Sequence, residues 1–298
     1  MSCRRPRQAR VRMFSLPRLI ASALFALLVS VAAQAAGPDP KVLRVCADPR
    51  SPPLSDSAGG GYENRIAELV GSDLGLPVEY VWMPQRMGFI RNTLRAADGR
   101  GGFRCDIVMG VPADYEMTAT TRPYLHSSWV MVLADRPELA AVRSADDLLR
   151  LPPDILARLR FGAFTKTQPL DWLFKHELYG QTTVYQTLSG DPDEFPGQIV
   201  SGDLVDGKID IALVWGPIGG YFAKQAKAPL RVVALSSTPQ FKFDYLLSFG
   251  VRHPDKAWRD RLDGVIARRQ ADIDRILDDY GVPRLELPPP PPASGAKS

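Results

Sequence analysis

Two similar apolar stretches decide how this chain folds: CDIVMGVP at residues 105–112 and IDIALVWGP at residues 209–217. In each, an aspartate opens a strand that ends in glycine and proline before a helix, and the strand is too apolar for an exposed edge. Their occurrence at matching places predicts two related α/β lobes. Because open parallel sheets bind ligands beyond the carboxyl ends of their strands, we expect both strand ends to face one cleft.

The residues around the first stretch predict a βαβαβ unit, which implies a parallel sheet with right-handed crossovers. The first helix has one apolar face and is ended by Gly75 and Pro77. The expected strands are 42–47, 78–82 and 105–111, and the expected helices are 62–74 and 86–97.

A second α/β set follows a connecting strand at 129–133. We expect lobe 1 to comprise 37–132 with 236–286 and lobe 2 to comprise 133–235, joined by two crossover strands. The expected helices are 144–150, 169–179, 196–205, 218–227 and 256–279, and the expected strands are 160–164, 182–186, 209–215, 230–234 and 244–251.

The first 36 residues have the pattern of a secretory signal peptide. Six arginines precede the apolar run Leu19 to Val31, and Ala33-Gln34-Ala35 fits a signal-peptidase site. The alternative is a membrane anchor, but about 13 apolar residues fall short of the ~20 that a span needs. We therefore expect export by the Sec route to the periplasm of a Gram-negative cell.

Removal of this leader changes the charge of the protein. Without its six arginines, 31 of the 37 basic residues remain against 33 acidic residues, a net charge of −2. The mature chain therefore offers no electrostatic case for nucleic-acid binding.

Two cysteines, Cys46 and Cys105, remain after Cys3 leaves with the leader. An oxidising compartment favours a disulfide between them, and the alternative is two small buried apolar residues. No histidine lies at a useful spacing from them, so we expect no metal site. Residues 287–298 are proline-rich and then polar, which predicts a disordered tail.

Several motifs between residues 41 and 283 resemble those of type II periplasmic solute-binding proteins of the amino-acid-binding superfamily. They include Leu43-Arg44-Val45 leading to Asp48-Pro49, the helix start Gly61-Tyr62-Glu63-Asn64, and Thr121-Arg122-Pro123-Tyr124. The resemblance implies an α/β fold of two lobes with a central cleft and two crossover strands.

Within that superfamily, further motifs resemble the quinoprotein dehydrogenase-associated branch, the MxaJ/XoxJ type. The segment 84–94 (PQRMGFIRNTL) is long and unusual, and 45–49 (VCADP), 110–113 (GVPA) and 214–217 (VWGP) agree with it. This resemblance implies a periplasmic accessory of a PQQ-dependent methanol or alcohol dehydrogenase, with its cytochrome c as a further partner. PQQ and a metal would then belong to the dehydrogenase, and no cofactor is expected in this chain.

The chain departs from amino-acid binders where they hold their ligand. An arginine soon after the third strand usually clamps the substrate carboxylate, but here that stretch is Pro112-Ala113-Asp114. An aspartate after the later strand usually holds the ammonium group, but here Trp215-Gly216 stands there. Both halves of the clamp are absent, which disfavours amino-acid binding.

Candidate site residues follow the predicted strands, and each has a structural alternative. Thr165, Lys166 and Thr167 begin a helix and either bind an anion or cap it. Trp215 either stacks on a ligand or partner or packs in the core, and Asp48 either binds or caps a turn. Gln85, Arg86 and Pro112 are expected near the cleft mouth, although Arg86 and Arg91 are otherwise solvated or paired with acids such as Glu63.

Three functions remain open. The first is the accessory protein, and the second is a transporter receptor that closes on a small solute by hinge motion. The third, a lyase, is disfavoured because His126, His176 and His253 are isolated and no catalytic triad, phosphate loop or zinc spacing is found. We therefore expect no enzymatic activity.

Overall fold

The computed structural model describes residues 41–187 and 195–289. The expected signal peptide, Cys3 and the tail from residue 290 onward lie outside the described residues. The helices are α2 (Tyr62–Leu74), α3 (Phe89–Asn92), α4 (Ala145–Leu149), α5 (Pro153–Leu156), α6 (Gln168–Lys175), α7 (Gly216–Gln225) and α8 (Lys256–Asp279). Short 3-10 turns lie at Pro137–Leu139 and Tyr179–Gln181, and a π-helix lies at Ile199–Leu204.

The strands form a mixed sheet whose order is β4-β1-β5-β12-β7-β10-β8-β9, with β11 also paired to β7 and β6 to β12. A separate short ribbon joins β2 and β3. The strands are β1 (Leu43–Ala47), β2 (Arg50–Ser51), β3 (Ser55–Asp56), β4 (Val78–Trp82), β5 (Ile107–Pro112), β6 (Ala119–Thr120), β7 (Leu125–Ala134), β8 (Phe161–Phe164), β9 (Thr182–Tyr185), β10 (Ile211–Trp215), β11 (Leu230–Ala234) and β12 (Asp244–Val251).

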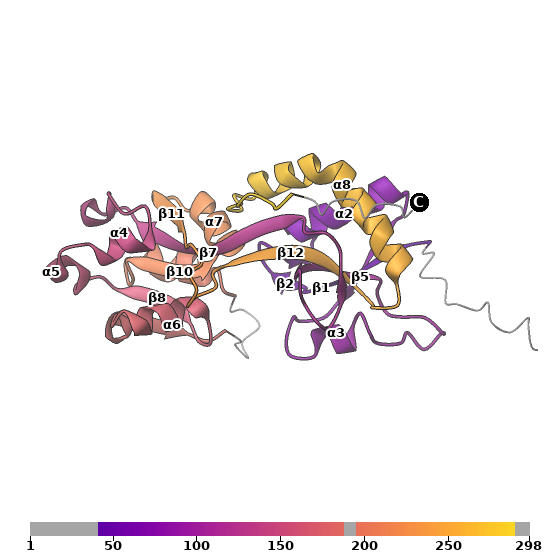
Figure 1. The fold of residues 1–298 in the computed structure, drawn as a ribbon, viewed down its shortest axis with the longest axis horizontal. Coiled ribbons are helices and arrows are strands. Elements are labelled where there is room, and N and C mark those ends of the chain that lie inside the picture. Colours follow the sequence, from indigo (N-terminus) through magenta and orange to yellow (C-terminus); the bar gives the residue numbers. More distant parts are fainter. Residues whose placement is uncertain (1–40, 188–194, 290–298) are drawn as a thin grey trace, which may run out of the picture. The chain divides into compact units, whose positions relative to one another are not determined.

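Two groups of parallel strands confirm the predicted α/β repeats. β1 is parallel to β4 and β5, and β8 is parallel to β9 and β10. The long strands β7 and β12 run antiparallel side by side and connect the two groups (Figure 1). The boundaries expected for the two lobes stay a prediction.

The stretches 105–112 and 209–217 are anchored by equivalent hydrogen bonds between an aspartate and an arginine. Asp106 accepts hydrogen bonds from the backbone N–H and the guanidinium Nε of Arg44, at 3.2 and 3.1 Å. Asp210 accepts the same pair of bonds from Arg160, at 2.9 and 3.1 Å. In each half, the aspartate before the buried strand therefore fixes the start of the neighbouring parallel strand.

Helices cover the sheet with separate apolar clusters. In the first group of strands, α2 and α8 pack Ile66 and Trp258 against Ile107. In the second group, α6 packs Trp172 against Phe161 and Leu213. A third cluster, on β7, β10 and α7, contains Val130, Val214 and Ile218.

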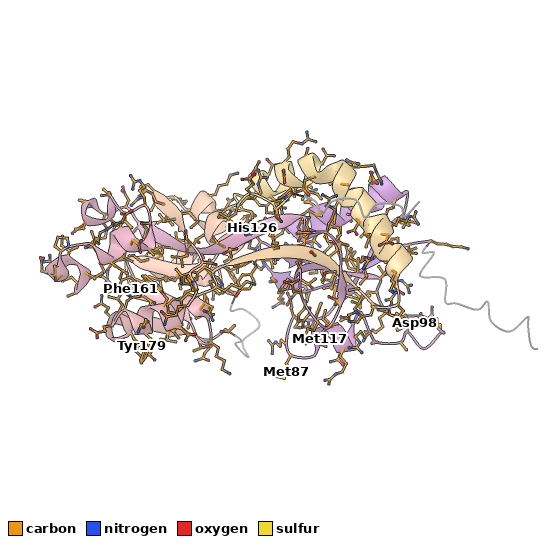
Figure 2. All side chains as sticks on the ribbon, viewed as in Figure 1. Met87, Asp98, Met117, His126, Phe161 and Tyr179 are labelled. Carbon is orange, nitrogen blue, oxygen red and sulfur yellow. A yellow bond between two sulfur atoms is a disulfide. The ribbon has the colours of Figure 1, made fainter. Side chains whose placement is uncertain are left out.

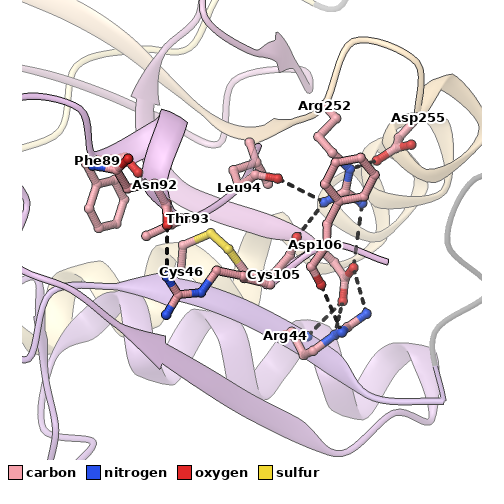
Figure 3. Close-up of a disulfide and its surroundings, with 12 residues drawn as sticks. Arg44, Cys46, Phe89, Asn92, Thr93, Leu94, Cys105, Asp106, Arg252 and Asp255 are labelled. Atoms are coloured by element: carbon pink, nitrogen blue, oxygen red, sulfur yellow. Dashed lines mark hydrogen bonds and ion pairs between the residues drawn. A yellow bond between two sulfur atoms is a disulfide. The ribbon is translucent and has the colours of Figure 1, made fainter. Parts of the chain in front are cut away.

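Cys46 and Cys105 form a disulfide, with their Cα atoms 5.7 Å apart (Figure 3). The expected pairing of the two cysteines is therefore confirmed. Beside the disulfide, the buried Arg252 donates to the carbonyl oxygens of Leu94, at 3.2 Å, and of Cys105. Its Nε lies 2.7 Å from the carboxylate of Asp255. This charge is therefore compensated, as a buried guanidinium requires.

The helix expected over 86–97 is wrong in length. Only Phe89–Asn92 is helical, because Gly88 enters it with a φ of 86° and Thr93 leaves the helical region. The Thr93 hydroxyl donates to the carbonyl of Phe89 at 2.6 Å, and the chain then folds back so that Arg104 N bonds Ala96 O.

Two other helices also differ from expectation. The helix expected over 169–179 ends at Lys175, since Glu177 has a φ of 62° that no α-helix accommodates. The segment expected as a helix over 196–205 contains a π-helix instead.

Candidate functional site

A groove of about 500 Å³ lies beside α3 and the end of β5. It brings together three of the predicted site residues, Gln85, Arg86 and Pro112. Its other lining residues are Met87, Gly88, Phe89, Ile90, Arg91, Gly110, Val111, Tyr115 and Met117.

The loop that forms one wall of the groove is tied to the end of β1. Asp48 accepts hydrogen bonds from the backbone N–H of Gln85 at 2.6 Å and of Arg50 at 2.8 Å. Asp48 therefore caps the turns that follow β1 and β4, and its predicted role in binding stays a prediction.

The floor of the groove rests on the disulfide. Phe89 and Ile90 are buried in one cluster with Cys46, Cys105 and Val111. Met117 accepts a hydrogen bond from the Tyr115 hydroxyl at 3.4 Å. The disulfide therefore belongs to the cluster that packs under the α3 residues lining the groove.

The rim of the groove carries an exposed apolar side chain. Met87 is 97% exposed, and it projects from the loop before α3 on the side where Met117 also lies (Figure 2). Arginine, methionine and aromatic residues are enriched in protein interfaces, whereas lysine, glutamate and aspartate are depleted. Among the described residues that line the groove there is no lysine, glutamate or aspartate. The lining therefore has the composition of a protein-binding surface.

Glu63 is a buried residue beside Gly110 of the groove, and the sequence motifs did not indicate its burial. Its side chain is 9% exposed at the start of α2, and no hydrogen bond or ion pair of its carboxyl group is found in the described residues. It is therefore not the partner of Arg86 or Arg91 that the sequence suggested. Helical spacing could have placed it inside, because residues 63, 66, 67 and 70 share one face of α2.

Burial dominates the chemistry of Glu63. Loss of solvent, and then the negative charge of Asp48, raises the pKa of its carboxyl from 4.5 to about 8. Its Oε1 lies against the position that a Cβ on Gly110 would occupy, and the φ of 63° at Gly110 favours glycine at this point of β5. In the described part of the chain, the buried hydroxyl of Tyr124 nearby also lacks a hydrogen-bond partner.

The predicted anion site at the start of α6 lies in the other group of strands. Lys166 is exposed with a φ of 58°, and the Thr165 hydroxyl lies 3.3 Å from that of Thr187. Thr167 precedes α6, but its hydroxyl donates to the carbonyl of Phe164 at 2.7 Å instead of accepting from the helix. Side-chain capping by Thr167 is therefore wrong, and anion binding there stays a prediction.

Trp215 packs among other aromatic rings at the end of β10. Its ring lies 5.9 Å from those of both Trp129 and Tyr245, edge-on in each case, and it is half-buried. Gly216 permits the close approach of α7, since a Cβ there would come within 2.3 Å of the Ser128 carbonyl oxygen. These ring contacts support packing as one role of Trp215. A role in ligand binding stays a prediction.

Residues 41–187 and 195–289 contain neither a cluster of metal ligands nor a membrane-spanning helix. No group of three or more His, Cys, Asp or Glu side chains there is placed to hold a metal ion. No helix in this part of the chain is both long and apolar enough to cross a membrane.

Comparisons with known proteins agree with the sequence motifs. None of the protein-family models matches the chain. The protein MoxJ of Methylorubrum extorquens is 28% identical over 271 residues, which cover 87% of this chain and 86% of MoxJ. Among solved structures, MxaJ from Methlophaga aminisulfidivorans MPT covers 82% of this chain and 100% of its own, with 21% identity and a TM-score of 0.69.

A second solved structure is more similar in sequence. The periplasmic binding protein XoxJ from Methylobacterium extorquens AM1 is 33% identical, with a TM-score of 0.66, and the match covers 82% of this chain and 100% of XoxJ. The fold is that of the type II periplasmic binding proteins. The chain therefore belongs to the MxaJ/XoxJ type of periplasmic binding proteins.

Proposed function

We propose that this protein is a periplasmic accessory of a PQQ-dependent methanol or alcohol dehydrogenase, and that it docks on the dehydrogenase and assists its maturation or activity. The protein itself carries no catalytic role in this proposal. The observation that carries the proposal is the groove beside α3, whose lining combines arginine, methionine and aromatic side chains without lysine or carboxylate among the described residues.

The groove favours a protein over a small polar solute. Met87 is almost fully exposed, and burying a methionine side chain contributes about 1.5–3 kcal/mol. An amino-acid receptor would need an arginine near the end of β5 and an aspartate near the end of β10. Pro112 ends β5, and Trp215 ends β10. At these two positions, this chain therefore lacks the side chains with which a solute receptor would hold a zwitterion.

The test is direct binding of the mature protein to the dehydrogenase of the same host. We expect Met87→Asp to weaken binding about tenfold, because a buried apolar anchor becomes a charge that must be desolvated. The measurement is calorimetry or surface plasmon resonance, together with the yield of active dehydrogenase.

Phe174→Asp is the matched control. Phe174 is 70% exposed on α6, in the other group of strands, and the substitution adds the same charge. Equal affinities for the two variants would argue against the groove as the docking site. A micromolar solute that raises the melting temperature, with no dehydrogenase bound, would instead establish a transport receptor.

A further inference from the structure

The polar side chains of the groove are all hydrogen-bond donors or can act as donors. Arg91 offers guanidinium N–H groups, Tyr115 offers a hydroxyl, and Gln85 offers an amide NH₂. Among the described residues that line the groove, none carries a carboxylate that could accept these bonds. An occupant that pairs with the Arg91 guanidinium must therefore bring an acceptor with it.

Arg91 is a charged donor in this groove. Its side chain is exposed on α3, and its guanidinium folds over the loop, with Nη2 3.2 Å from where a Cβ on Gly88 would be. No carboxylate or carbonyl partner of this guanidinium is found in the described residues. Other arginines near this part of the sheet are paired, such as Arg44 with Asp106 and Arg252 with Asp255.

The donors stand next to apolar surface. Met87, Phe89 and Met117 line the same groove. Among the residues that the structure describes, the Tyr115 hydroxyl has only the thioether of Met117, a weak acceptor, as its partner. A carboxylate would accept stronger, charge-assisted bonds from Arg91 and Tyr115 than any present partner does. The apolar neighbours would exclude water from those bonds and so strengthen them.

We propose that the groove binds a segment of the partner dehydrogenase in which an aspartate or glutamate side chain is flanked by apolar residues. This inference rests on the proposed function and names the chemistry of the partner segment. The carboxylate sits at Arg91 and Tyr115, and the flanking apolar residues cover Met87 and Met117.

The decisive variant is Arg91→Glu in the mature protein. We expect it to weaken binding of the dehydrogenase at least about tenfold, since a carboxylate would then face a carboxylate. Wild-type binding should weaken as the salt concentration rises from about 0.01 M to about 0.15 M, because salt screens the attraction between the two opposite charges as the proteins associate. Arg91→Lys should retain part of the affinity, since it keeps the charge but loses the bidentate geometry.

Arg95→Glu is the matched control. Arg95 is exposed, has no side-chain partner in the described residues, lies one turn beyond Arg91 and does not line the groove. The substitution changes the net charge equally, so it is expected to leave the affinity within about twofold, the scale of a surface change. Thermal melting of each variant confirms that it is folded.

A charge swap completes the test. Hydrogen exchange of the complex locates the protected dehydrogenase segment, and replacement of its carboxylate by lysine should restore binding to Arg91→Glu at least about tenfold. Wild-type affinity in Arg91→Glu, or equal losses in Arg91→Glu and Arg95→Glu, would overturn the inference and leave the proposed function intact. Absence of binding by the wild-type protein would overturn both this inference and the proposed function.

Discussion

Glu63 shows what a single buried carboxyl group does to this protein. The pKa of Glu63 is raised to about 8, so between about pH 4.5 and pH 8 the folded chain binds a proton that the unfolded chain releases. The contribution of this group to stability therefore falls as the pH rises through that window and is constant above it. We expect Glu63→Gln, which stays neutral, to gain stability over the wild type with pH, by up to about 1.4 kcal/mol for each pH unit in the window.

Chemical denaturation at a series of pH values measures this difference. Glu79→Gln, which changes an exposed carboxyl on β4, is the control and should follow the wild-type curve. If the curves of Glu63→Gln and the wild type run parallel from about pH 4.5 to pH 8, the assignment of a raised pKa to Glu63 is wrong.

At the scale of elements, the segment that follows α8 is attached to the long strand β7. His126 Nδ1 lies 2.7 Å from the carbonyl oxygen of Glu286, and its Nε2 lies 2.9 Å from the carboxylate of Asp244 on β12. The backbone N–H of Leu285 also donates to the carbonyl of His126 at 2.8 Å.

We expect His126→Ala to loosen this C-terminal segment from β7. Loss of the two side-chain bonds should speed hydrogen exchange of the Leu285 amide by about tenfold, which corresponds to about 1.4 kcal/mol. Mass spectrometry of the C-terminal peptides measures the exchange. His253 contacts the carbonyl oxygen of Glu116, so His253→Ala should leave the exchange of the Leu285 amide unchanged. Equal exchange rates in the two variants would contradict the role of His126.

At the scale of the molecule, the Cys46–Cys105 disulfide links β1 to the residues before β5 and lies close to the groove. The disulfide closes a sequence separation of 59 residues, between β1 and the start of β5, and lies in the cluster that supports α3. We expect Cys46→Ala/Cys105→Ala to lower the free energy of unfolding by about 4 kcal/mol, chiefly because the unfolded chain gains freedom.

The same double variant should bind the dehydrogenase more weakly, because Phe89 and Ile90 lose the support beneath the groove. Denaturation with and without a thiol reductant measures the effect on stability. The reductant should destabilise the wild type and leave the double variant unchanged. A wild type that is insensitive to complete reduction would show that the cross-link does not stabilise the fold.

The sequence by itself determined the repeated α/β organisation, the family and several elements to the residue. Helix α8 and strands β4, β11 and β12 have the predicted bounds, because a long apolar stripe or a short β-rich run between turn residues is a local property of the chain. Gln85, Arg86 and Pro112, which were expected near the cleft mouth, line the groove because they lie at or after strand ends that were predictable, and their role in binding stays a prediction.

Only the tertiary structure decided the groove and its chemistry. Helix α3 ends after one turn because Gly88 and Thr93 leave the helical region, which the apolar pattern of 86–97 does not show. The groove joins residues 85–91 to 110–117, and Glu63 is buried against Gly110; these contacts depend on the pairing of β1 with β5. Periodicity gives the face on which a side chain lies, but its neighbours across the fold come from packing between segments distant in the sequence.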